Sequence, residues 1–340
     1  MPTIHRDYEL RDHNTFGIAA TCSGFVRVES EQELREVLQQ RGDLEPFVLG
    51  GGSNMLLTRH QEGKLFIKND IRARHMLHES PSHVIVEAGG GEPWHDFVLW
   101  SLEQGYGGLE NLSLIPGTVG AAPIQNIGAY GVELKDVFYS LRAMHIATGE
   151  MRTFDRFDCD FGYRDSVFKR DLKGQYAISR VRMQLTRGGH HELHTDYGAI
   201  REALSNQSIT DPTPADISRA VVSIRQSKLP DPAELGNSGS FFKNPELSRE
   251  HFEQLQAAHP EVVYYDLPDG RVKVPAGWLI EQCGYKGKRI GNTGAHAHQA
   301  LVLVNYGGAT GDEVWAFAQE IQAAVRDRFG VEIQPEVNVL

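Results

Sequence analysis

The first 57 residues contain short apolar runs and one amphipathic segment, a pattern that predicts strands around a single helix. Residues 24–30 predict a strand. Ser30 and Glu33 then form a capping-box sequence, and apolar residues follow at helical spacing: Leu34, Val37 and Leu38. Residues 46–50 predict a short buried strand that runs directly into a glycine loop over residues 50–54.

The pattern between residues 83 and 187 combines one helix with several strands. Residues 83–87 alternate as a strand, and Pro93 opens a helix that should end near Gln104. Residues 141–147 and 151–154 flank Thr148-Gly149-Glu150, which predicts a hairpin. A further strand has one face made of Ala177, Ser179, Val181, Met183 and Leu185. Its opposite face consists of Arg180, Arg182 and Gln184.

The remainder of the chain has an α+β pattern that differs from the first half. Apolar spacing predicts helices over residues 214–228, 248–258, 275–283 and 310–329. Thr310 and Glu313 form a capping-box sequence at the start of the last helix, whose inner face should carry Val314, Phe317, Ile321 and Val325. Strands are predicted over residues 300–305 and 331–339, and a turn-rich segment over residues 236–240.

Residues 107–131 follow none of these periodicities. The segment is rich in glycine and contains Pro116 and Pro123, yet it also carries six aliphatic side chains: Leu109, Leu112, Leu114, Ile115, Ile124 and Ile127. Glycine lets a backbone approach a ligand closely or take positive φ, whereas proline fixes φ and removes an N–H. We therefore expect a buried, irregular pair of loops that lays backbone N–H groups against a large ligand.

The loop Gly50-Gly51-Gly52-Ser53-Asn54 follows a strand, as nucleotide-binding loops often do. It lacks the third glycine and the helix start of the Rossmann fingerprint, and no Gly-Lys-Ser/Thr sequence of a P-loop follows. Backbone N–H groups in such a turn can still bind a diphosphate. The alternative is an ordinary tight turn.

Charge and cysteine content narrow the class of protein. A net charge of −11 with no basic stretch argues against a nucleic-acid partner. The three cysteines, Cys22, Cys159 and Cys283, are far apart and odd in number, which fits a reducing cytosol better than a disulfide framework or a zinc site. No signal peptide and no membrane span is visible, so we expect a cytoplasmic protein with no membrane partner.

Two polar groups of residues invite chemical hypotheses. Gly236-Asn237-Ser238-Gly239-Ser240 departs from the Gly-x-Ser-x-Gly elbow of hydrolases, and serine is common in turns. Lys228, Ser240, Lys243 and Asn244 nevertheless occur close together in sequence and could hold a phosphate or carboxylate beside one hydroxyl. His190, His191 and His194 suggest a metal, but they lack a partner carboxylate on a helix, so we expect a solvated polar edge and no metal site.

Seven short segments occur in an order that resembles one enzyme family. They are residues 14–18, 49–55, 115–120, 123–131, 163–166, 239–245 and 335–337. The chain is similar to the UDP-N-acetylenolpyruvoylglucosamine reductases, the MurB family of flavoenzymes in bacterial cell-wall precursor synthesis. Each segment is weak evidence by itself, but the ordered set covers nearly the whole chain and is specific.

The resemblance implies an α+β chain with an FAD-binding domain of the vanillyl-alcohol-oxidase (PCMH) type. That domain would span residues 1–188, in subdomains of about 1–70 and 71–188. A substrate-closing loop and linker would follow over residues 189–212, and a smaller substrate-binding domain over residues 213–330. Residues 331–340 would form a C-terminal strand that returns to the active site.

The resemblance also implies a reaction in two halves. NADPH gives hydride to N5 of a non-covalently bound FAD, and NADP leaves. UDP-N-acetylglucosamine enolpyruvate then enters the same site and accepts hydride at its methylene carbon, which builds negative charge on the adjacent carbon and its carboxylate. A proton completes UDP-N-acetylmuramate. UDP-N-acetylglucosamine enolpyruvate and NADPH are therefore the expected partners, and we expect a monomer.

Residues that match the family's motifs receive their roles from the resemblance. Arg164 and Glu336 would act at the substrate carboxylate, and Ser240 would donate the proton. The residues expected to bind FAD are Gly50, Gly51, Gly52, Ser53, Asn54, Ile115, Pro116, Gly117, Gly120, Gln125, Asn126, Gly128, Ala129 and Tyr130. Those expected to bind the nucleotide sugar are Tyr163, Tyr197, Lys228, Asn244, Tyr265 and Gln299. Tyr197 corresponds to the loop tyrosine of the family's longer class, to which we assign the chain.

Some alternatives remain at this point. Arg164 could instead pair with one of three carboxylates: Asp158, Asp160 or Asp165. Ala121-Ala122 stands where many relatives carry a serine, so a side-chain contact to flavin is in doubt there. A flavin oxidase on the same type of domain would turn over without NADPH, and a nucleotide-sugar binding module without catalysis would be colourless.

Overall fold

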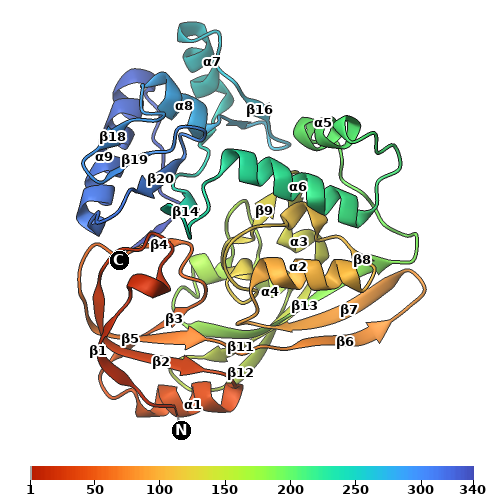
Figure 1. The fold of residues 1–340 in the computed structure, drawn as a ribbon, viewed down its shortest axis with the longest axis vertical. Helices are drawn as coiled ribbons and strands as arrows, with labels where there is room; N and C mark the ends of the chain where they lie inside the picture. Colours follow the sequence, from red (N-terminus) through yellow and green to blue (C-terminus); the bar gives the residue numbers. More distant parts are fainter. Residues whose placement is uncertain (1) are drawn as a thin grey trace. The chain divides into compact units, whose positions relative to one another are not determined.

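The structure, a computed structural model, describes residues 2–340 and divides into two units (Figure 1). Unit 1 comprises residues 2–8, 22–51 and 62–227, and unit 2 comprises residues 9–21, 52–61 and 228–340. The division after Ser227 differs from the expected substrate domain, which began at residue 213, because a long helix over residues 214–228 packs within unit 1.

The first sheet of unit 1 has strand order β1-β2-β5-β3, with β3 and β5 parallel. Its strands are β1 (His5–Glu9), β2 (Thr21–Val28), β3 (Glu45–Leu49) and β5 (Gln61–Asn69). Helix α1 (Glu31–Gln40) begins at Ser30, whose hydroxyl accepts from the N–H of Glu33 at 3.1 Å. The predicted apolar side of α1 is buried against Val26, Leu65 and Ile67 of the sheet.

The second sheet of unit 1 is antiparallel and centres on a long strand. Its order is β12-β11-β13-β7-β6, with β8 also paired to β13. The strands are β6 (Arg74–Glu79), β7 (His83–Gly89), β8 (Tyr106–Gly107), β11 (Phe138–His145), β12 (Met151–Asp155) and β13 (Tyr176–Arg187). The predicted hairpin is confirmed, since Met144 pairs with Met151 across the turn. The predicted apolar face of β13 is buried, while Arg180 and Arg182 bind the carboxylate of Glu87.

Helix α2 (Trp94–Glu103) covers this second sheet, and Pro93 precedes it as predicted (Figure 1). Trp94 and Phe97 belong to the same buried cluster as Val84 and Val86 of β7. The shorter elements around it are η2 (Glu110–Leu112), η3 (Ala122–Gln125), β9 (Gly128–Ala129), β10 (Val132–Glu133), α3 (Leu134–Val137), α4 (Arg156–Cys159) and η4 (Val167–Lys169). Residues 107–131 therefore form the irregular segment that the sequence predicts, and Leu109 and Leu112 within it are fully buried.

Helices α5 (Gly198–Asn206) and α6 (Pro214–Lys228) complete unit 1. Ile200 and Leu204 of α5 pack with Ile217 and Val221 of α6 in one buried cluster, and Tyr130 contacts that cluster. The helix predicted from residue 214 to residue 228 is thus confirmed, and it contacts the glycine-rich segment.

Unit 2 is built from short strands and three helices within the described residues. The strands are β4 (Met55–Leu56), β14 (Gly236–Ser240), β15 (Glu246–Leu247), β16 (Tyr265–Asp266), β17 (Val272–Lys273), β18 (Arg289–Ile290), β19 (Thr293–Ala295), β20 (Val302–Asn305) and β21 (Asn338–Val339). The helices are α7 (Arg249–Ala258), α8 (Ala276–Gln282) and α9 (Gly311–Phe329), and a 3-10 turn spans Arg11–His13. The capping box and the inner face predicted for α9 are both present.

Two predictions for unit 2 are wrong. Residues 236–240 form strand β14, not a turn-rich segment, because Gly236 and Asn237 pair with residues of β20. Residues 331–337 are not a strand, because their backbone carbonyls accept hydrogen bonds from a side chain and from a loop rather than from a neighbouring strand. The Ile333 carbonyl accepts from Gln322, and the Gln334 carbonyl accepts from the Lys243 N–H.

None of the helices formed by residues 2–340 has the length and the apolar content needed to cross a membrane.

Candidate active site

The two glycine loops expected to bind FAD approach each other closely in unit 1. A Cβ added to Gly51 would lie 2.9 Å from the Cα of Gly117, and one added to Gly50 would lie 2.7 Å from Oγ1 of Thr118. A Cβ on Gly120 would lie 2.9 Å from the Cα of Gly90. Larger residues would force these backbones apart, so glycine at these positions allows the loops to lie side by side.

The rest of the first glycine loop belongs to unit 2. Gly52 has φ of +65°, and its Cβ would lie 2.0 Å from the carbonyl oxygen of His13. The Asn54 carbonyl accepts from both the backbone N–H and the side-chain amide of Asn338, at 3.1 Å and 2.9 Å. Ser53, in the same part of the loop, is half-buried. The end of the loop therefore contacts the C-terminal segment of the chain.

Left-handed backbone conformations gather around the second glycine segment. Of the non-glycine residues with positive φ among residues 2–340, Leu114, Asn126 and Tyr130 lie on this segment, with φ of 57°, 44° and 50°. Such conformations cost about 1–3 kcal/mol each and persist only where surrounding contacts impose them. They occur often at ligand-binding sites, so this strain supports the prediction of a ligand loop.

Asn126 explains how part of the segment is held. Its side chain is fully buried and donates to the Gly162 carbonyl at 2.9 Å, while its oxygen accepts from the Lys135 N–H at 3.0 Å. Asn126 thus connects the segment to the turn before Arg164. Its side chain stabilises the protein backbone here.

Arg164 reaches the same segment from that turn. It has φ of 52°, and its Nη2 donates to the Gly128 carbonyl at 2.5 Å. Its guanidinium also lies 5.4 Å from the centre of the Tyr163 ring. Since cations stack favourably on aromatic faces, Tyr163 helps to orient Arg164.

The three carboxylates that could have neutralised Arg164 are held by other arginines. Asp160 and Asp165 form ion pairs with Arg170, and Asp158 pairs with Arg152 at 2.8 Å. The hydrogen bond that Arg170 donates to Asp165 is the main cause of a raised pKa of the Arg170 guanidinium, which keeps that arginine in its charged form.

A second arginine that the sequence gave no reason to select lies beside this group. Arg225 of α6 donates from Nε to the Leu114 carbonyl at 3.2 Å and forms a hydrogen bond with the Tyr130 phenol. Burial lowers the pKa of Arg225, the nearby Tyr130 opposes that effect, and the charge of Arg164 lowers the pKa further. Burial likewise raises the pKa of Tyr130. The only sequence signal for Arg225 is its position beside the apolar face of α6.

Tyr197, expected to close over the substrate, packs against the same segment. Its ring meets the Tyr130 ring edge-to-face, with centroids 5.2 Å apart. The Asn111 amide donates both to the Tyr130 carbonyl at 3.1 Å and to the His194 carbonyl at 2.9 Å, while its own oxygen is buried without a hydrogen-bond partner. The segment before Tyr197 is therefore connected directly to the glycine-rich segment.

In unit 2, the expected proton donor and its partner carboxylate belong to adjacent segments. Ser240 ends β14 and has an exposed side chain. The Glu336 N–H donates to the carbonyl of Phe241 at 2.8 Å, directly after Ser240. Ser238, in the same strand, donates to the Met55 carbonyl at 3.2 Å. The glycine-loop end, β14 and the C-terminal segment thus lie together in unit 2.

The remaining residues expected to bind the nucleotide sugar are less closely connected. Asn244 accepts from the Ala276 N–H at the start of α8, at 3.0 Å, and Gln299 accepts from the Leu301 N–H at 3.4 Å. Lys228 and Tyr265 have exposed side chains. Of the hydrogen bonds among residues 2–340, none joins Lys228 or Tyr265 to Ser240.

The histidines considered as metal ligands have ordinary partners. Nδ1 of His191 lies 2.8 Å from Oγ1 of Thr186, and the His194 carbonyl accepts from Asn111. Across residues 2–340, no three side chains of His, Cys, Asp or Glu gather in a way that could hold a metal ion.

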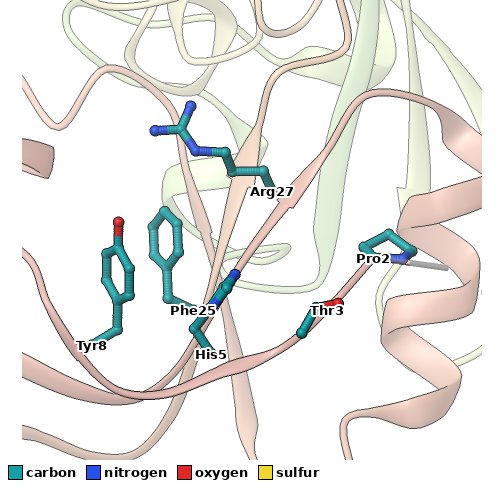
Figure 2. A pocket seen from close by; sticks show the side chains of 6 residues that line it. All are labelled: Pro2, Thr3, His5, Tyr8, Phe25 and Arg27. Carbon is teal, nitrogen blue, oxygen red and sulfur yellow. The ribbon is translucent and has the colours of Figure 1, made fainter.

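Figure 2 shows a hollow beside the first sheet of unit 1, lined by Pro2, Thr3, His5, Tyr8, Phe25 and Arg27. The rings of Tyr8 and Phe25 are stacked there, with centroids 4.1 Å apart. None of the residues expected to bind cofactor or substrate lines this hollow.

The residues around the glycine segments fit a large anionic cofactor such as FAD. The close backbone approach at Gly51 and Gly117 provides backbone dipoles in unit 1. The guanidiniums of Arg164 and Arg225 add positive charge to the same unit. Such groups favour a bound diphosphate or an anionic ring.

Comparisons with known proteins agree with this description. Residues 22–155 match a family described as "FAD binding domain", and residues 231–340 match "UDP-N-acetylenolpyruvoylglucosamine reductase, C-terminal domain". The chain is 50% identical over 337 residues to the UDP-N-acetylenolpyruvoylglucosamine reductase of Flavobacterium johnsoniae, with 99% of each chain covered. It is 53% identical over 333 residues to that of Pseudomonas putida, with 97% of each covered.

Solved structures support the fold. The UDP-N-acetylenolpyruvylglucosamine reductase of Thermus caldophilus superposes with a TM-score of 0.67 at 21% identity, covering 100% of this chain and 99% of the other. A solvent-stable cholesterol oxidase gives a TM-score of 0.50 at 13% identity, covering 98% and 87%. The prediction of an α+β chain with a PCMH-type FAD-binding domain is confirmed. Because near-complete relatives share about half of its residues, this chain belongs to the UDP-N-acetylenolpyruvoylglucosamine reductase family of oxidoreductases.

Proposed function

We propose that this chain reduces UDP-N-acetylglucosamine enolpyruvate to UDP-N-acetylmuramate with NADPH as electron donor, as a monomer in cytoplasmic synthesis of peptidoglycan precursors. The observation that carries the proposal is the identity of 50% along 99% of a relative named as this reductase. Ser240 and Glu336, on neighbouring segments of unit 2, supply the acid and the carboxylate that such a reaction requires.

FAD, when bound, supplies the hydride carrier that connects NADPH with the enolpyruvyl methylene carbon. The residues expected to hold it are those of the two glycine segments. Gly50 and Gly51 contact the second segment within unit 1, and backbone N–H groups there would bind the diphosphate. The Ala121-Ala122 pair has no hydroxyl, so contacts at that position would come from the backbone.

Arg164 would bind the substrate carboxylate and stabilise the negative charge that develops beside it. The guanidinium is held by the Gly128 carbonyl, and Lys169 donates to the Arg164 carbonyl at 3.2 Å. A donor fixed in advance is effective because it need not reorganise during the reaction, and loss of one such donor costs about 3 kcal/mol of transition-state stabilisation. Glu336 would act beside it on the same carboxylate.

Ser240 would donate the proton that completes the product. A serine hydroxyl is a weak acid in water, but a site that excludes water can use it against a strongly basic carbanion. Its position at the end of β14 leaves the hydroxyl exposed for a ligand. Tyr163, Tyr197, Lys228, Asn244, Tyr265 and Gln299 would hold the nucleotide sugar.

The two half-reactions can be tested separately without oxygen. The purified chain should contain flavin, NADPH should bleach its absorption near the visible maximum, and the enolpyruvyl substrate should restore it. Ser240→Ala should leave bleaching by NADPH unchanged and slow only the restoration. Ser238→Ala, which removes a neighbouring hydroxyl bonded to the Met55 carbonyl, is the matched control.

Other outcomes would support other functions. Equal slowing of both half-reactions in Ser240→Ala would make Ser240 structural. Rapid turnover with oxygen, independent of the nucleotide sugar, would favour a flavin oxidase. A protein that remains colourless after addition of FAD would be a binding module and would overturn the proposal.

A further inference from the structure

Leu114 is the residue at which the second glycine segment turns toward its expected cofactor contacts, and its conformation is strained. Its φ of 57° is left-handed, which costs an ordinary L-residue roughly 1–2 kcal/mol. Ile115, Pro116 and Gly117 follow directly, so any change in the φ of Leu114 would redirect the loop that contains them. Something in the fold must impose this conformation.

Two helices impose it through side chains. The Leu114 N–H donates to Nδ1 of His95 in α2 at 3.0 Å. The Leu114 carbonyl accepts from Nε of Arg225 in α6 at 3.2 Å. Both backbone polar groups of this one residue are therefore bonded to side chains from two helices that lie far apart in the sequence.

Arg225 also reaches the far end of the same segment. Its guanidinium hydrogen-bonds the phenol of Tyr130, which is itself left-handed with φ of 50°. Within residues 2–340, no ion pair joins Arg225 to a carboxylate, although its side chain is half-buried. Removing a charge from water without a carboxylate partner has a free-energy cost, which the contacts to Leu114 and Tyr130 help to offset.

A further hydrogen bond fixes α6 at this point. Ser113, adjacent to Leu114, lies 2.8 Å from the Ser218 hydroxyl of α6, and both side chains are buried. Ser218 and Arg225 are two turns apart on the helix, so α6 contacts the segment at both Ser113 and Leu114. This second contact links α6 to the segment directly beside Leu114.

We propose that Arg225 and His95 are positioning residues of the FAD site, which hold Leu114 in its left-handed conformation and thereby preset the loop over residues 115–120 for the cofactor. They act through the backbone of Leu114 and the phenol of Tyr130, and the inference rests on FAD binding alone. It is independent of the electron donor and of the nucleotide-sugar substrate in the proposed function.

Three substitutions remove different parts of these contacts and should each weaken FAD binding. Arg225→Lys keeps the charge but loses the planar fork that binds Leu114 and Tyr130 together. Arg225→Gln loses the charge as well. We expect each to weaken FAD binding about tenfold, since one hydrogen bond to a charged group contributes about that much. His95→Phe keeps the ring shape without an acceptor and should weaken binding similarly.

Leu114→Gly provides a test that separates positioning from general damage. Glycine adopts φ near +57° without strain, so the loop would no longer need the two side chains to hold it. Leu114→Gly should therefore restore much of the affinity lost in Arg225→Gln and in His95→Phe. A merely destabilised protein would become worse, because glycine adds conformational entropy to the unfolded chain.

The experiment titrates FAD into the full-length deflavinated variants and follows flavin fluorescence quenching and the visible absorption band. Arg219→Gln is the matched control, since Arg219 lies on α6 with an exposed side chain paired to Asp216. Tenfold weaker binding with rescue by Leu114→Gly supports the inference. Unchanged binding in Arg225→Gln and His95→Phe, or loss without rescue, overturns it. Failure of the unsubstituted chain to bind FAD would instead overturn the proposed function.

Discussion

Substituting Gly51 by alanine tests whether the two glycine loops must lie side by side. The added Cβ would be 2.9 Å from the Cα of Gly117. Non-bonded carbons prefer about 3.5–4.0 Å, so the loops would have to separate by roughly 0.6–1.1 Å. The added Cβ would meet backbone atoms of Gly117, and glycine has no side chain that could rotate away to make room.

The expected cost follows from this geometry. Overpacking of this kind costs about 1–3 kcal/mol, which corresponds to FAD binding weakened by about tenfold to one-hundredfold if the loops must close to bind. Isothermal titration of FAD into the full-length variant measures the affinity. Urea unfolding of the same protein without FAD measures how much the substitution lowers the free energy of unfolding of the protein alone.

Gly198→Ala is the matched control for Gly51→Ala. A Cβ on Gly198 meets no atom within 4 Å, and the residue begins α5, so alanine should leave FAD affinity unchanged and increase helix stability by up to about 1 kcal/mol. Wild-type FAD affinity in Gly51→Ala would show that the approach of the loops is irrelevant to the cofactor, and the assignment of Gly51 would be withdrawn.

Three further measurements test other parts of the structure. His95 should make the protein less stable as the pH is lowered. Burial lowers the pKa of this imidazole from 6.5, the charge of Asp96 raises it, and the charge of Arg225 lowers it further. The unfolded chain therefore binds the proton more readily than the folded chain does. The contribution of neutral His95 to stability is complete above pH 6.5 and is lost as the pH falls toward the pKa of His95 in the folded protein. The free energy of unfolding in urea should therefore differ less between pH 7 and pH 5 in His95→Gln than in wild type. An equal difference in the two proteins would contradict this. Thr310→Ala should destabilise the fold by about 1 kcal/mol in urea, because its hydroxyl caps α9 at the Glu313 N–H, and a loss below the error of the measurement would refute the capping role. Trp94→Phe removes the indole N–H that donates to the Leu112 carbonyl at 2.9 Å and should cost about 1–3 kcal/mol by thermal unfolding; a neutral result would mean that water replaces the donor.

Elements with local signals were predictable from the sequence. The capping residues Ser30 and Thr310 fix where α1 and α9 begin, and both helices bury the side that the spacing indicates. The alternation along β13 predicts its buried face in the same way. These features depend on residues only a few positions apart, which is why the sequence alone contains them.

Elements that depend on distant partners were not predictable. Residues 236–240 read as a turn because they are rich in glycine and serine, yet β20 offers backbone partners more than sixty positions later. Residues 331–337 alternate like a strand, but Lys243 and Gln322 use their carbonyls. In both cases hydrogen bonding across the fold decides against the local pattern.

The candidate site shows the same limit. Glycine content predicts the loops that include Gly51 and Gly117, because glycine is the residue that allows two backbones to approach this closely. Arg225 has no such signal, because an arginine at the edge of an apolar helix face is usually solvated. The role proposed for it follows only from the fold, which places the Leu114 carbonyl beside it.

The path of the chain has a consequence for synthesis on the ribosome. Residues 9–21 and 52–61 belong to unit 2, whose remaining part begins at residue 228. Strand β4 finds its parallel partner in β21, and the Thr58 N–H donates to the Leu340 carbonyl at 2.8 Å. These early segments therefore complete their pairing only after residues 338–340 have been synthesised. A substitution that disrupts β21 should therefore also destabilise β4, far away in the sequence.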